Sequence, residues 1–484
     1  SFDDDTIAAL RTKHPSRAQS AAGPPPPPPK NSLQGLMELT EANVVEAIKT
    51  FPPGSAGGLD GLRPQHLKDM ISTETGQAGQ RLVYHLTRFV NLCLAGRVPT
   101  AVRPVFCGAS LCALSKKDGG IRPIAVGCTL RRLVAKAACR AVKSKMAALL
   151  APVQLGFGIK HGIEAAVHAG RLYLQNAQRG QAMLKLDFSN AFNTLSRDEL
   201  LRAVKEQAPE LYPFAYICYE NATHLIFRDV LLRSEEGAQQ GDPLGPLFFC
   251  LTVKNLFSKL KSEFGVWYLD DGTLGGSGDN LLNDFQTVLS EARHIGLTLN
   301  EQKCELITSD QNVIARFRSV APDMLVSKPE QAVLLGAPVG GSTSVDHVLA
   351  SKLKELHRLA ERLKQLNVHD AFFLLKNCFH IPKLLYTLRS APCHNSTILE
   401  QYDTAIRDTL QSVLNVRMTE SVWDQAVLPV SRGGLGIRAA THVALPAFLS
   451  SVTSAESLTV QLLPPRLHPT AGISDPLFEQ AVTE

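Results

Sequence analysis

The feature that most constrains this chain is a pair of adjacent aspartates, Asp270 and Asp271, between two apolar stretches. The sequence around them, residues 267–272, reads Trp-Tyr-Leu-Asp-Asp-Gly, and Gly275 and Gly276 follow. Apolar runs on both sides of a short polar break favour two strands joined by a tight turn. Neighbouring carboxylates repel each other unless a cation lies between them, so this pair either caps a solvated hairpin or helps to hold a metal ion.

A third aspartate favours the metal interpretation. Asp187 ends another apolar run, residues 183–186, upstream of the pair. Three carboxylates of this kind suit two Mg²⁺ ions about 3.5–4 Å apart, one activating a hydroxyl for attack and the other stabilising the leaving oxygens; Mn²⁺ is a possible substitute. The three aspartates therefore predict nucleotidyl-transfer chemistry.

Length and composition allow a large globular enzyme. The 484 residues are 44% apolar, which is enough for two or three domains, and the formal charge of +5 permits a basic channel without proving a nucleic-acid partner. No apolar run is long enough to span a bilayer, and the first residues lack the pattern of a signal peptide. We expect a soluble, intracellular protein with no membrane partner. The ten cysteines are scattered singly, so we expect buried, reduced thiols rather than a zinc site.

The chain begins with a polar segment that ends in a run of prolines, Pro24 to Pro29. Such a run is extended and is not expected to join a packed core, so residues 1–31 are predicted to be a disordered tether. The alternative is a docking site for a protein partner with an aromatic groove. Ordered structure is expected to begin near Thr40, which can cap a helix that carries Val44, Val45 and Ile48 on one side.

The middle of the chain mixes helical and strand-like patterns. Residues 131–150 are typical of a helix, and residues 111–114 and 121–124 are typical of strands, so an α+β domain is expected. Beyond about residue 345, leucines recur at three- and four-residue steps up to Leu366, which predicts an amphipathic helix. Its other face carries Lys and Arg, which either form a solvated face or contact phosphates. The tail from about residue 440 has few periodic residues and is expected to be less ordered.

Further segments around the aspartates form an ordered series. Residues 187–194 follow the first carboxylate, and Ser196 with Glu199 predicts a helix cap. The glycines and prolines of residues 237–246 let the backbone approach a ligand closely, and the glutamines there can reach a base or a sugar. Residues 296–305 bring Lys303, whose charge suits a leaving pyrophosphate. An apolar hairpin is expected at residues 334–340.

The order of these segments resembles the palm of reverse transcriptases. That family has an Asp followed by an aromatic five residues later, a Gln-Gly-x-Pro segment, a Tyr-x-Asp-Asp hairpin, a Gly-Leu…Asn…Lys element and a Leu-Gly primer-grip hairpin. Upstream and downstream segments are similar to the non-LTR retrotransposon and group II intron branch of the family. They are residues 58–64 and 114–124 of the fingers, residues 154–158 before the first Asp, and residues 433–437 after the thumb.

The resemblance covers about residues 40 to 445 and implies a role for each matching residue. Asp187, Asp270 and Asp271 would be catalytic metal ligands, joined by the carbonyl of Phe188. The implied nucleotide-binding residues are Phe188 together with Lys116 and Arg122 at the triphosphate, Gln240 and Gly241 in the pocket, Lys303 near the leaving group, and Phe192 under the sugar. A ring at position 192 would exclude a ribose 2′-hydroxyl. Lys303 as a surface residue, and Arg122 with Gly120 as parts of a plain hairpin turn, are the alternatives.

Two positions depart from the family pattern. Leu269 stands where Ala is usual in the Asp-Asp hairpin, and Gly245 stands where Ser is commoner. Neither removes a ligand or donor that the chemistry needs. No resemblance to an endonuclease, a Cys/His knuckle or an RNase H is seen.

The resemblance implies an α+β, right-hand polymerase with fingers, palm (an antiparallel sheet backed by helices) and an α-helical thumb. The expected ranges are 1–31 for the disordered tether, 32–182 for the N-terminal extension and fingers, 183–344 for the palm, 345–445 for the thumb and 446–484 for a C-terminal tail. The expected activity is RNA-templated DNA synthesis from dNTPs on a DNA or RNA primer, in a retrotransposon-type element or a gene derived from one, and a nuclear location if that element is eukaryotic. The alternatives are an RNA-dependent RNA polymerase and an inactive palm that serves as a nucleic-acid-binding scaffold.

Overall fold

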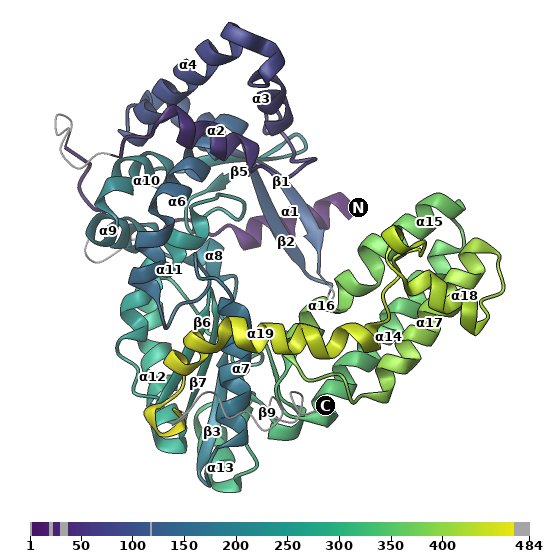
Figure 1. Ribbon diagram of the computed structural model, residues 1–484. Helices are drawn as coiled ribbons and strands as arrows, with labels where there is room; N and C mark the ends of the chain where they lie inside the picture. The colour runs from purple at the N-terminus through teal and green to yellow at the C-terminus, as the bar shows by residue number, and fades with distance from the viewer. Residues whose placement is uncertain (1, 19–22, 30–36, 117–118, 469–484) are drawn as a thin grey trace.

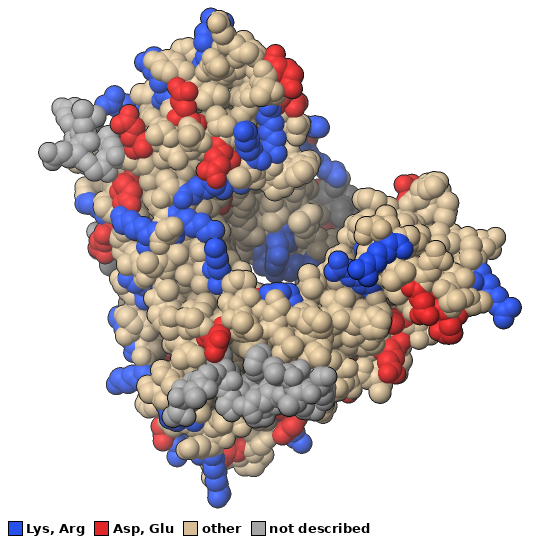
Figure 2. All heavy atoms as spheres, viewed as in Figure 1, with Lys and Arg blue, Asp and Glu red and all other residues tan. Residues whose placement is uncertain are grey.

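The computed structural model describes residues 2–18, 23–29, 37–116 and 119–468. The molecule has three parts: a smaller sheet with helices at the top, a larger sheet with helices at the bottom, and a helical arm at the right (Figure 1). The space-filling view shows a hollow between them (Figure 2). This mixed α+β arrangement of fingers, palm and thumb confirms the right-hand architecture that the sequence predicts.

The palm is built on a five-stranded sheet in the order β6-β7-β3-β8-β9. Its central strand, β3, is antiparallel to both β7 and β8, with Leu186 opposite Gly272 and Lys185 opposite Glu305. Because β3 lies in the middle, the residues that follow it come out beside the turn between β6 and β7. The strands are β3 (Gln181–Leu186), β6 (Phe264–Tyr268), β7 (Asp271–Ser277), β8 (Glu305–Ile307) and β9 (Leu325–Ser327).

Helices cover both faces of this sheet, which explains why β3 is apolar on both sides. Leu184 shares a core with Phe285 of α12 (Gly278–His294), whereas Met183 shares a different core with Tyr173 of α7 (Gly162–Gln175). All four side chains are buried. Successive residues of a strand point to opposite faces, so a sheet that is covered twice needs apolar residues at consecutive positions.

The fingers carry a four-stranded sheet in the order β2-β1-β4-β5. Its strands are β1 (Ala109–Ser115), β2 (Ile121–Gly127), β4 (Thr223–Phe227) and β5 (Val230–Ser234). The strands expected at residues 111–114 and 121–124 are present and form the β1–β2 hairpin, with Ser115 opposite Ile121. Pairing of β1 with β4 is parallel and joins segments more than a hundred residues apart.

The other helices of the fingers and palm match the sequence patterns where these were strong. Thr40 caps α2, and the helix predicted at residues 131–150 is α6. These helices are α2 (Glu41–Lys49), α3 (Pro64–Met70), α4 (Gly76–Leu94), α5 (Arg103–Phe106), α6 (Thr129–Leu150), α8 (Ala191–Thr194), α9 (Arg197–Gln207), α10 (Tyr212–Tyr219), α11 (Gly245–Phe257) and α13 (Gln311–Val320).

The thumb begins after a small hairpin and has a core of its own. The predicted amphipathic helix is α14, which buries Leu349, Leu356 and Leu363; it ends at Leu363, so Leu366 lies beyond it and is exposed. The elements are β10 (Val333–Leu334), β11 (Ala337–Pro338), α14 (Ser342–Leu363), α15 (Val368–Leu374), α16 (Ile381–Ser390), α17 (Thr397–Leu414), α18 (Glu420–Val427) and α19 (Ala440–Leu462), with a π-helical turn at Leu375–Phe379.

The expectation of a less ordered tail from about residue 440 is wrong for the described residues. Helix α19 begins at Ala440, runs without a break past residue 446, where the C-terminal tail was expected to begin, and continues to Leu462; it connects the thumb to the palm (Figure 1). Ala455 and Leu462 are buried in the core that includes α7. By length and composition α19 is apolar enough to cross a membrane, but it packs along α7, α16 and α17, which accounts for its apolar character. Residues 469–484 lie outside the described part.

The expectation of a disordered tether at residues 1–31 is also wrong for the described residues. Residues 2–13 form α1 (Phe2–Lys13), and Leu10 is buried among the fingers strands. Pro25 is buried as well, and the Tyr212 hydroxyl donates to the Pro26 carbonyl at 2.5 Å. A proline run has no N–H to donate, but its rings and carbonyls can still pack on an aromatic surface. We call residues 2–18 and 23–29 the N-terminal strap.

The predicted boundary between fingers and palm does not separate the two sheets. Helix α7, which falls in the range 32–182, packs beside β6 of the palm, and strands β4 and β5, which fall in the range 183–344, complete the fingers sheet. The chain crosses between the two parts because parallel pairing of β1 with β4 requires a long connection.

Candidate active site

The two adjacent aspartates lie at the turn between β6 and β7, as expected. Tyr268 is paired with Asp271, so Leu269 and Asp270 form the two-residue connection. Leu269 has a φ of +57°, a conformation that a bulky side chain adopts only at a cost of roughly 1–3 kcal/mol. The surrounding structure must therefore hold this turn in place.

Gln154 stabilises the turn by two hydrogen bonds to the backbone of Leu269. Its amide oxygen accepts from the Leu269 N–H at 2.9 Å, and its amide nitrogen donates to the Leu269 carbonyl at 3.1 Å. Gln154 is only 1% exposed, so both bonds are shielded from water. Gly156 lies against the same turn, where a Cβ would come within 2.6 Å of the Leu269 nitrogen. The Gln-x-Gly spacing was visible in the sequence, but the hydrogen bonds from Gln154 to the turn could not be predicted from it.

Asp187 comes directly after β3. Backbone hydrogen bonds with the segment that precedes β8 hold the chain at this point. The Asn300 N–H donates to the Asp187 carbonyl at 2.8 Å, and the Ser189 N–H donates to the Thr298 carbonyl at 2.9 Å. These two bonds flank the antiparallel bridge between Phe188 and its partner Leu299. Phe188 and Leu299 are thus a non-hydrogen-bonded pair. The Phe188 carbonyl therefore points away from Leu299, toward the side on which β7 pairs with β3. That is the side of the aspartate turn.

All three carboxyls have raised pKa values, and burial is the largest cause in each case. Burial raises the pKa of Asp187, and the charges of Lys303 and Lys116 oppose it. Burial and then the charge of Asp187 raise the pKa of Asp270. For Asp271, burial followed by the charges of Asp270 and Asp187 raises the pKa to about 6. The negative charges oppose one another, so a cation among them would relieve the repulsion.

The donor set suits a hard divalent cation. Carboxylate and carbonyl oxygens are the ligands that Mg²⁺ prefers, and the three aspartates with Phe188 supply only oxygen. In the part of the chain that the structure describes, no group of three or more His, Cys, Asp or Glu side chains stands at metal-ligand spacing. The acids line one cavity without forming a closed cage, which fits an ion that shares its ligands with a substrate.

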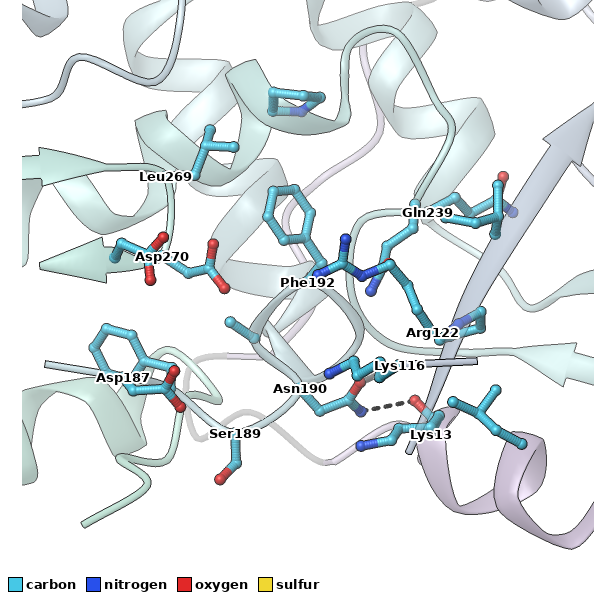
Figure 3. A pocket seen from close by; sticks show the side chains of 18 of the residues that line it. Lys13, Lys116, Arg122, Asp187, Ser189, Asn190, Phe192, Gln239, Leu269 and Asp270 are labelled. Carbon is cyan, nitrogen blue, oxygen red and sulfur yellow. Dashed lines mark hydrogen bonds between the residues drawn. The ribbon is translucent and has the colours of Figure 1, made fainter. Parts of the chain in front are cut away.

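Cationic side chains line the other side of the same cavity (Figure 3). Lys116 directly follows β1 and Arg122 lies in β2. The Lys116 N–H donates to the Gly120 carbonyl at 2.7 Å and closes the tip of this hairpin. Lys303 lies just before β8, is exposed, and lines the same cavity near enough to Asp187 for its charge to act on that carboxyl. The cavity has a volume of about 660 Å³, which is within the range for small-molecule sites.

Phe192 lies on α8 and faces the cavity between the acids and the cations (Figure 3). Its ring stacks on Phe249 of α11, with centroids 4.7 Å apart and planes inclined by 17°. Phe249 is fully buried, so it backs the Phe192 ring and limits its movement. The cavity therefore has a rigid aromatic wall at this position.

The Gln-Gly loop approaches the fingers sheet closely. The Ala125 N–H donates to the Gln240 carbonyl at 2.7 Å, and Gly241 has a φ of +123°. A Cβ at Gly241 would lie 2.3 Å from the Ala125 carbonyl oxygen, so only glycine fits. Gln239 and Gln240 both line the cavity, but Gln239 is buried and donates to the Cys107 carbonyl at 3.0 Å, whereas Gln240 is half-buried.

A buried polar network beneath this loop was not predicted from the sequence. Arg131 of α6 pairs with Asp242 at 2.7 Å, and both side chains are 2% exposed. The Tyr219 hydroxyl donates to the same carboxylate at 2.6 Å, and Arg131 also donates to Gln239. The network holds the Gln-Gly loop, residues 239–242, in place. Its members are separated by up to 111 residues, so no local pattern could have indicated it.

All ten residues expected at the site line this single cavity. Two sequence segments supply the acids and the phenylalanines, and three others supply the cations and the Gln-Gly loop. They are Lys116, Arg122, Asp187, Phe188, Phe192, Gln240, Gly241, Asp270, Asp271 and Lys303.

Comparison with known proteins agrees with the geometry. Residues 114–339 match the family described as "Reverse transcriptase (RNA-dependent DNA polymerase)". The 132 kDa protein of the retrotransposable element SLACS from Trypanosoma brucei gambiense is 23% identical over 426 residues, which are 85% of this chain and 34% of that protein. A Pol polyprotein from the type-1 retrotransposable element R2 of Popillia japonica is 25% identical over 283 residues, 53% of this chain and 46% of that protein.

This chain thus spans about a third to a half of the length of the curated relatives that it matches. Among solved structures, apo telomerase from Candida tropicalis superimposes with a TM-score of 0.39 and 13% identity over 72% of this chain and 66% of that chain.

Proposed function

We propose that this chain is an RNA-directed DNA polymerase of the non-LTR retrotransposon type that adds dNTPs to a primer 3′-hydroxyl. The proposal is supported by the match of residues 114–339 to the reverse transcriptase family and by the similarity to retrotransposon proteins. The observation that carries the proposal is the division of one cavity into an acidic side and a cationic side, with an aromatic wall between them. This is the layout that transfer of a nucleotide from a triphosphate needs, since metal-bound oxygens and phosphates meet at the bond that breaks.

The acidic side would hold the metal ions. Asp187, Asp270, Asp271 and the Phe188 carbonyl are the ligands that we propose for two Mg²⁺ ions. Such ions lower the pKa of the attacking hydroxyl and stabilise the charge on the leaving oxygens. Gln154 contributes by fixing Asp270 through the backbone of Leu269, so the carboxylates need little rearrangement when the ions bind.

The cationic side would bind the triphosphate. Lys116 and Arg122 project from the β1–β2 hairpin, whose tip is closed by a backbone hydrogen bond. Lys303 lies near Asp187. Charge-assisted hydrogen bonds from these groups would orient the triphosphate and neutralise the pyrophosphate as it leaves. Gln240 and Gly241 would line the base and sugar end of the pocket.

Phe192 would select the sugar. The ring cannot retreat because Phe249 backs it, so a nucleotide in this pocket meets a fixed wall. A 2′-hydroxyl would need the volume that the ring fills, which favours dNTPs over NTPs. This argues against the alternative of an RNA-dependent RNA polymerase.

The template-primer would lie in the hollow between the fingers, palm and thumb. Figure 2 shows Lys and Arg side chains on the walls and floor of this hollow. A basic hollow next to the acidic site suits the phosphates of an RNA template paired with a DNA or RNA primer. We propose a retrotransposon-type protein, or a protein derived from one, as the setting.

Primer extension tests the proposal. The purified chain is incubated with a homopolymeric RNA template, a complementary primer, Mg²⁺ or Mn²⁺, and either dNTPs or NTPs. We expect extension with dNTPs only. Extension with NTPs at equal efficiency would instead identify an RNA polymerase, and template-primer binding without any extension would identify an inactive scaffold.

A further inference from the structure

The N-terminal strap contributes a lysine to the active-site cavity that no motif of the polymerase predicts. Lys13 is the last residue of α1 and lines the same cavity as Lys116, Arg122 and the aspartates. Figure 3 shows Lys13 beside Lys116, on the side of the cavity away from Asp270. The sequence pattern offered no reason to place it there, because 174 residues separate it from Asp187 (187 − 13).

The strap is anchored on both sides of Lys13. On one side Leu10 is fully buried among fingers residues that include Leu111 and Leu225. On the other side Arg17 forms an ion pair with Asp198, whose side chain is only 6% exposed. Burial of a leucine stabilises by about 1.5–3 kcal/mol, so the strap is held by more than surface charge.

Three further hydrogen bonds fix the chain near Lys13. The Arg17 N–H donates to a Glu235 carboxylate oxygen at 3.2 Å, and the Ala18 N–H donates to Glu236 at 3.0 Å. Asn190, three residues after Asp187, donates through its side chain to the Lys13 carbonyl at 2.8 Å (Figure 3). The backbone of Lys13 is therefore tied to the segment that carries the first aspartate.

The ammonium group of Lys13 is left facing the cavity. Within the described residues, no carboxylate lies within ion-pair distance of it. The cations that lower the pKa of Asp187 are Lys303, Lys116 and Lys185, so Lys13 does not serve to neutralise that acid. A half-buried ammonium with no carboxylate partner, next to two other cations, suits a polyanion.

We propose that Lys13, which is held at the site by the N-terminal strap, binds the triphosphate of the incoming nucleotide and so adds to nucleotide affinity. This inference rests on the proposed function, because it takes the ligand of the cavity to be a nucleoside triphosphate. It goes beyond the polymerase motifs by making the N-terminal strap part of the nucleotide pocket.

Single-nucleotide incorporation on a fixed RNA template and primer tests the inference. Lys13→Ala should raise the KM for the dNTP by roughly tenfold, the value of one charge-assisted contact, and leave kcat and the template-primer Kd nearly unchanged. Lys13→Arg should keep most of the affinity. Arg11→Ala, an exposed cation on the same helix, is the matched control and should behave as the parent does.

A second measurement needs no catalysis. Titration of inorganic triphosphate into the full chain in the presence of Mg²⁺ should show weaker binding by Lys13→Ala than by the parent and the Arg11→Ala control. If triphosphate binding depends on Lys13 but the parent makes no DNA, the proposed function fails, and the contact of Lys13 with a triphosphate stands. An unchanged KM and unchanged triphosphate binding would overturn the inference. So would a lower KM, which would mean that Lys13 blocks the pocket, or a loss confined to template-primer affinity, which would mean a contact with the nucleic-acid backbone.

Discussion

At the scale of single residues, the site depends on side chains whose neighbours restrict them. Phe192 is backed by a fully buried ring, and the aspartates raise one another's pKa values. Both properties come from packing rather than from the residue type alone. They give two predictions that concern one side chain each.

Truncation of the aromatic wall should relax the choice of sugar. Phe192→Ala should keep activity with dNTPs and lower the ratio of kcat/KM for a dNTP to that for the matching NTP by on the order of a hundredfold, because the wall against the 2′-hydroxyl is gone. Phe192→Leu, which keeps much of the volume, should fall between the two. If Phe192→Ala keeps the parental ratio, the ring is only a part of the core.

The raised pKa of Asp271 makes stability depend on pH. Its pKa is about 6 in the folded protein against an ordinary value of 3.8, so the folded state binds more protons between these values. The free energy of unfolding should then fall as pH rises from about 4 to about 6. Asp271→Asn should flatten the curve in this window, as should saturating Mg²⁺ for the parent. Denaturant unfolding at several pH values measures this, and equal slopes for both proteins would contradict the assignment.

At the scale of elements, the turn between β6 and β7 illustrates how a distant loop holds a strained hairpin. The Leu269 backbone has a left-handed conformation, and the two bonds from Gln154 stabilise it. The Gln154 oxygen also accepts from the Gly156 N–H at 3.0 Å, so one amide organises both the turn and its own loop.

Removal of this amide should affect rate more than nucleotide affinity. Gln154→Ala leaves buried N–H groups without a partner and should lower the free energy of unfolding by about 1–3 kcal/mol. Loss of alignment at Asp270 should lower kcat by roughly tenfold or more with little change in the dNTP KM. Gln178→Ala, at an exposed position, is the matched control. A parental kcat in Gln154→Ala would show that the turn keeps its shape without the hydrogen bonds from Gln154.

At the scale of the whole molecule, the sequence predicted the local chemistry and missed the long-range packing. The ten expected site residues line one cavity, and each could be named in advance because it lies in a short motif with a fixed spacing. The helices at Thr40 and at residues 131–150 were predicted from a cap and from periodicity. The exact fingers sheet was missed because β4 pairs with β1 across more than a hundred residues. Periodicity reports which face of an element is apolar, but not which distant element covers it.

The N-terminal strap was missed for the same reason. Its proline run and polar composition are typical of a disordered segment, and nothing within it shows that Tyr212 and the fingers sheet receive it. The buried pair of Arg131 and Asp242 is a further case, since a charge run gives no hint that one arginine is buried with a partner 111 residues away.

The central claim is that the acids at the end of β3 and at the β6–β7 turn hold the metal ions for DNA synthesis. The most direct measurement is primer extension on an RNA template by Asp270→Asn, with the template-primer Kd determined in parallel and the exposed Asp323→Asn as the control. The amide keeps the shape of the carboxylate but loses the charge that the ions need. We predict no extension by Asp270→Asn, with parental template-primer affinity and parental activity of the control. Extension by Asp270→Asn at a rate near that of the parent would contradict the claim.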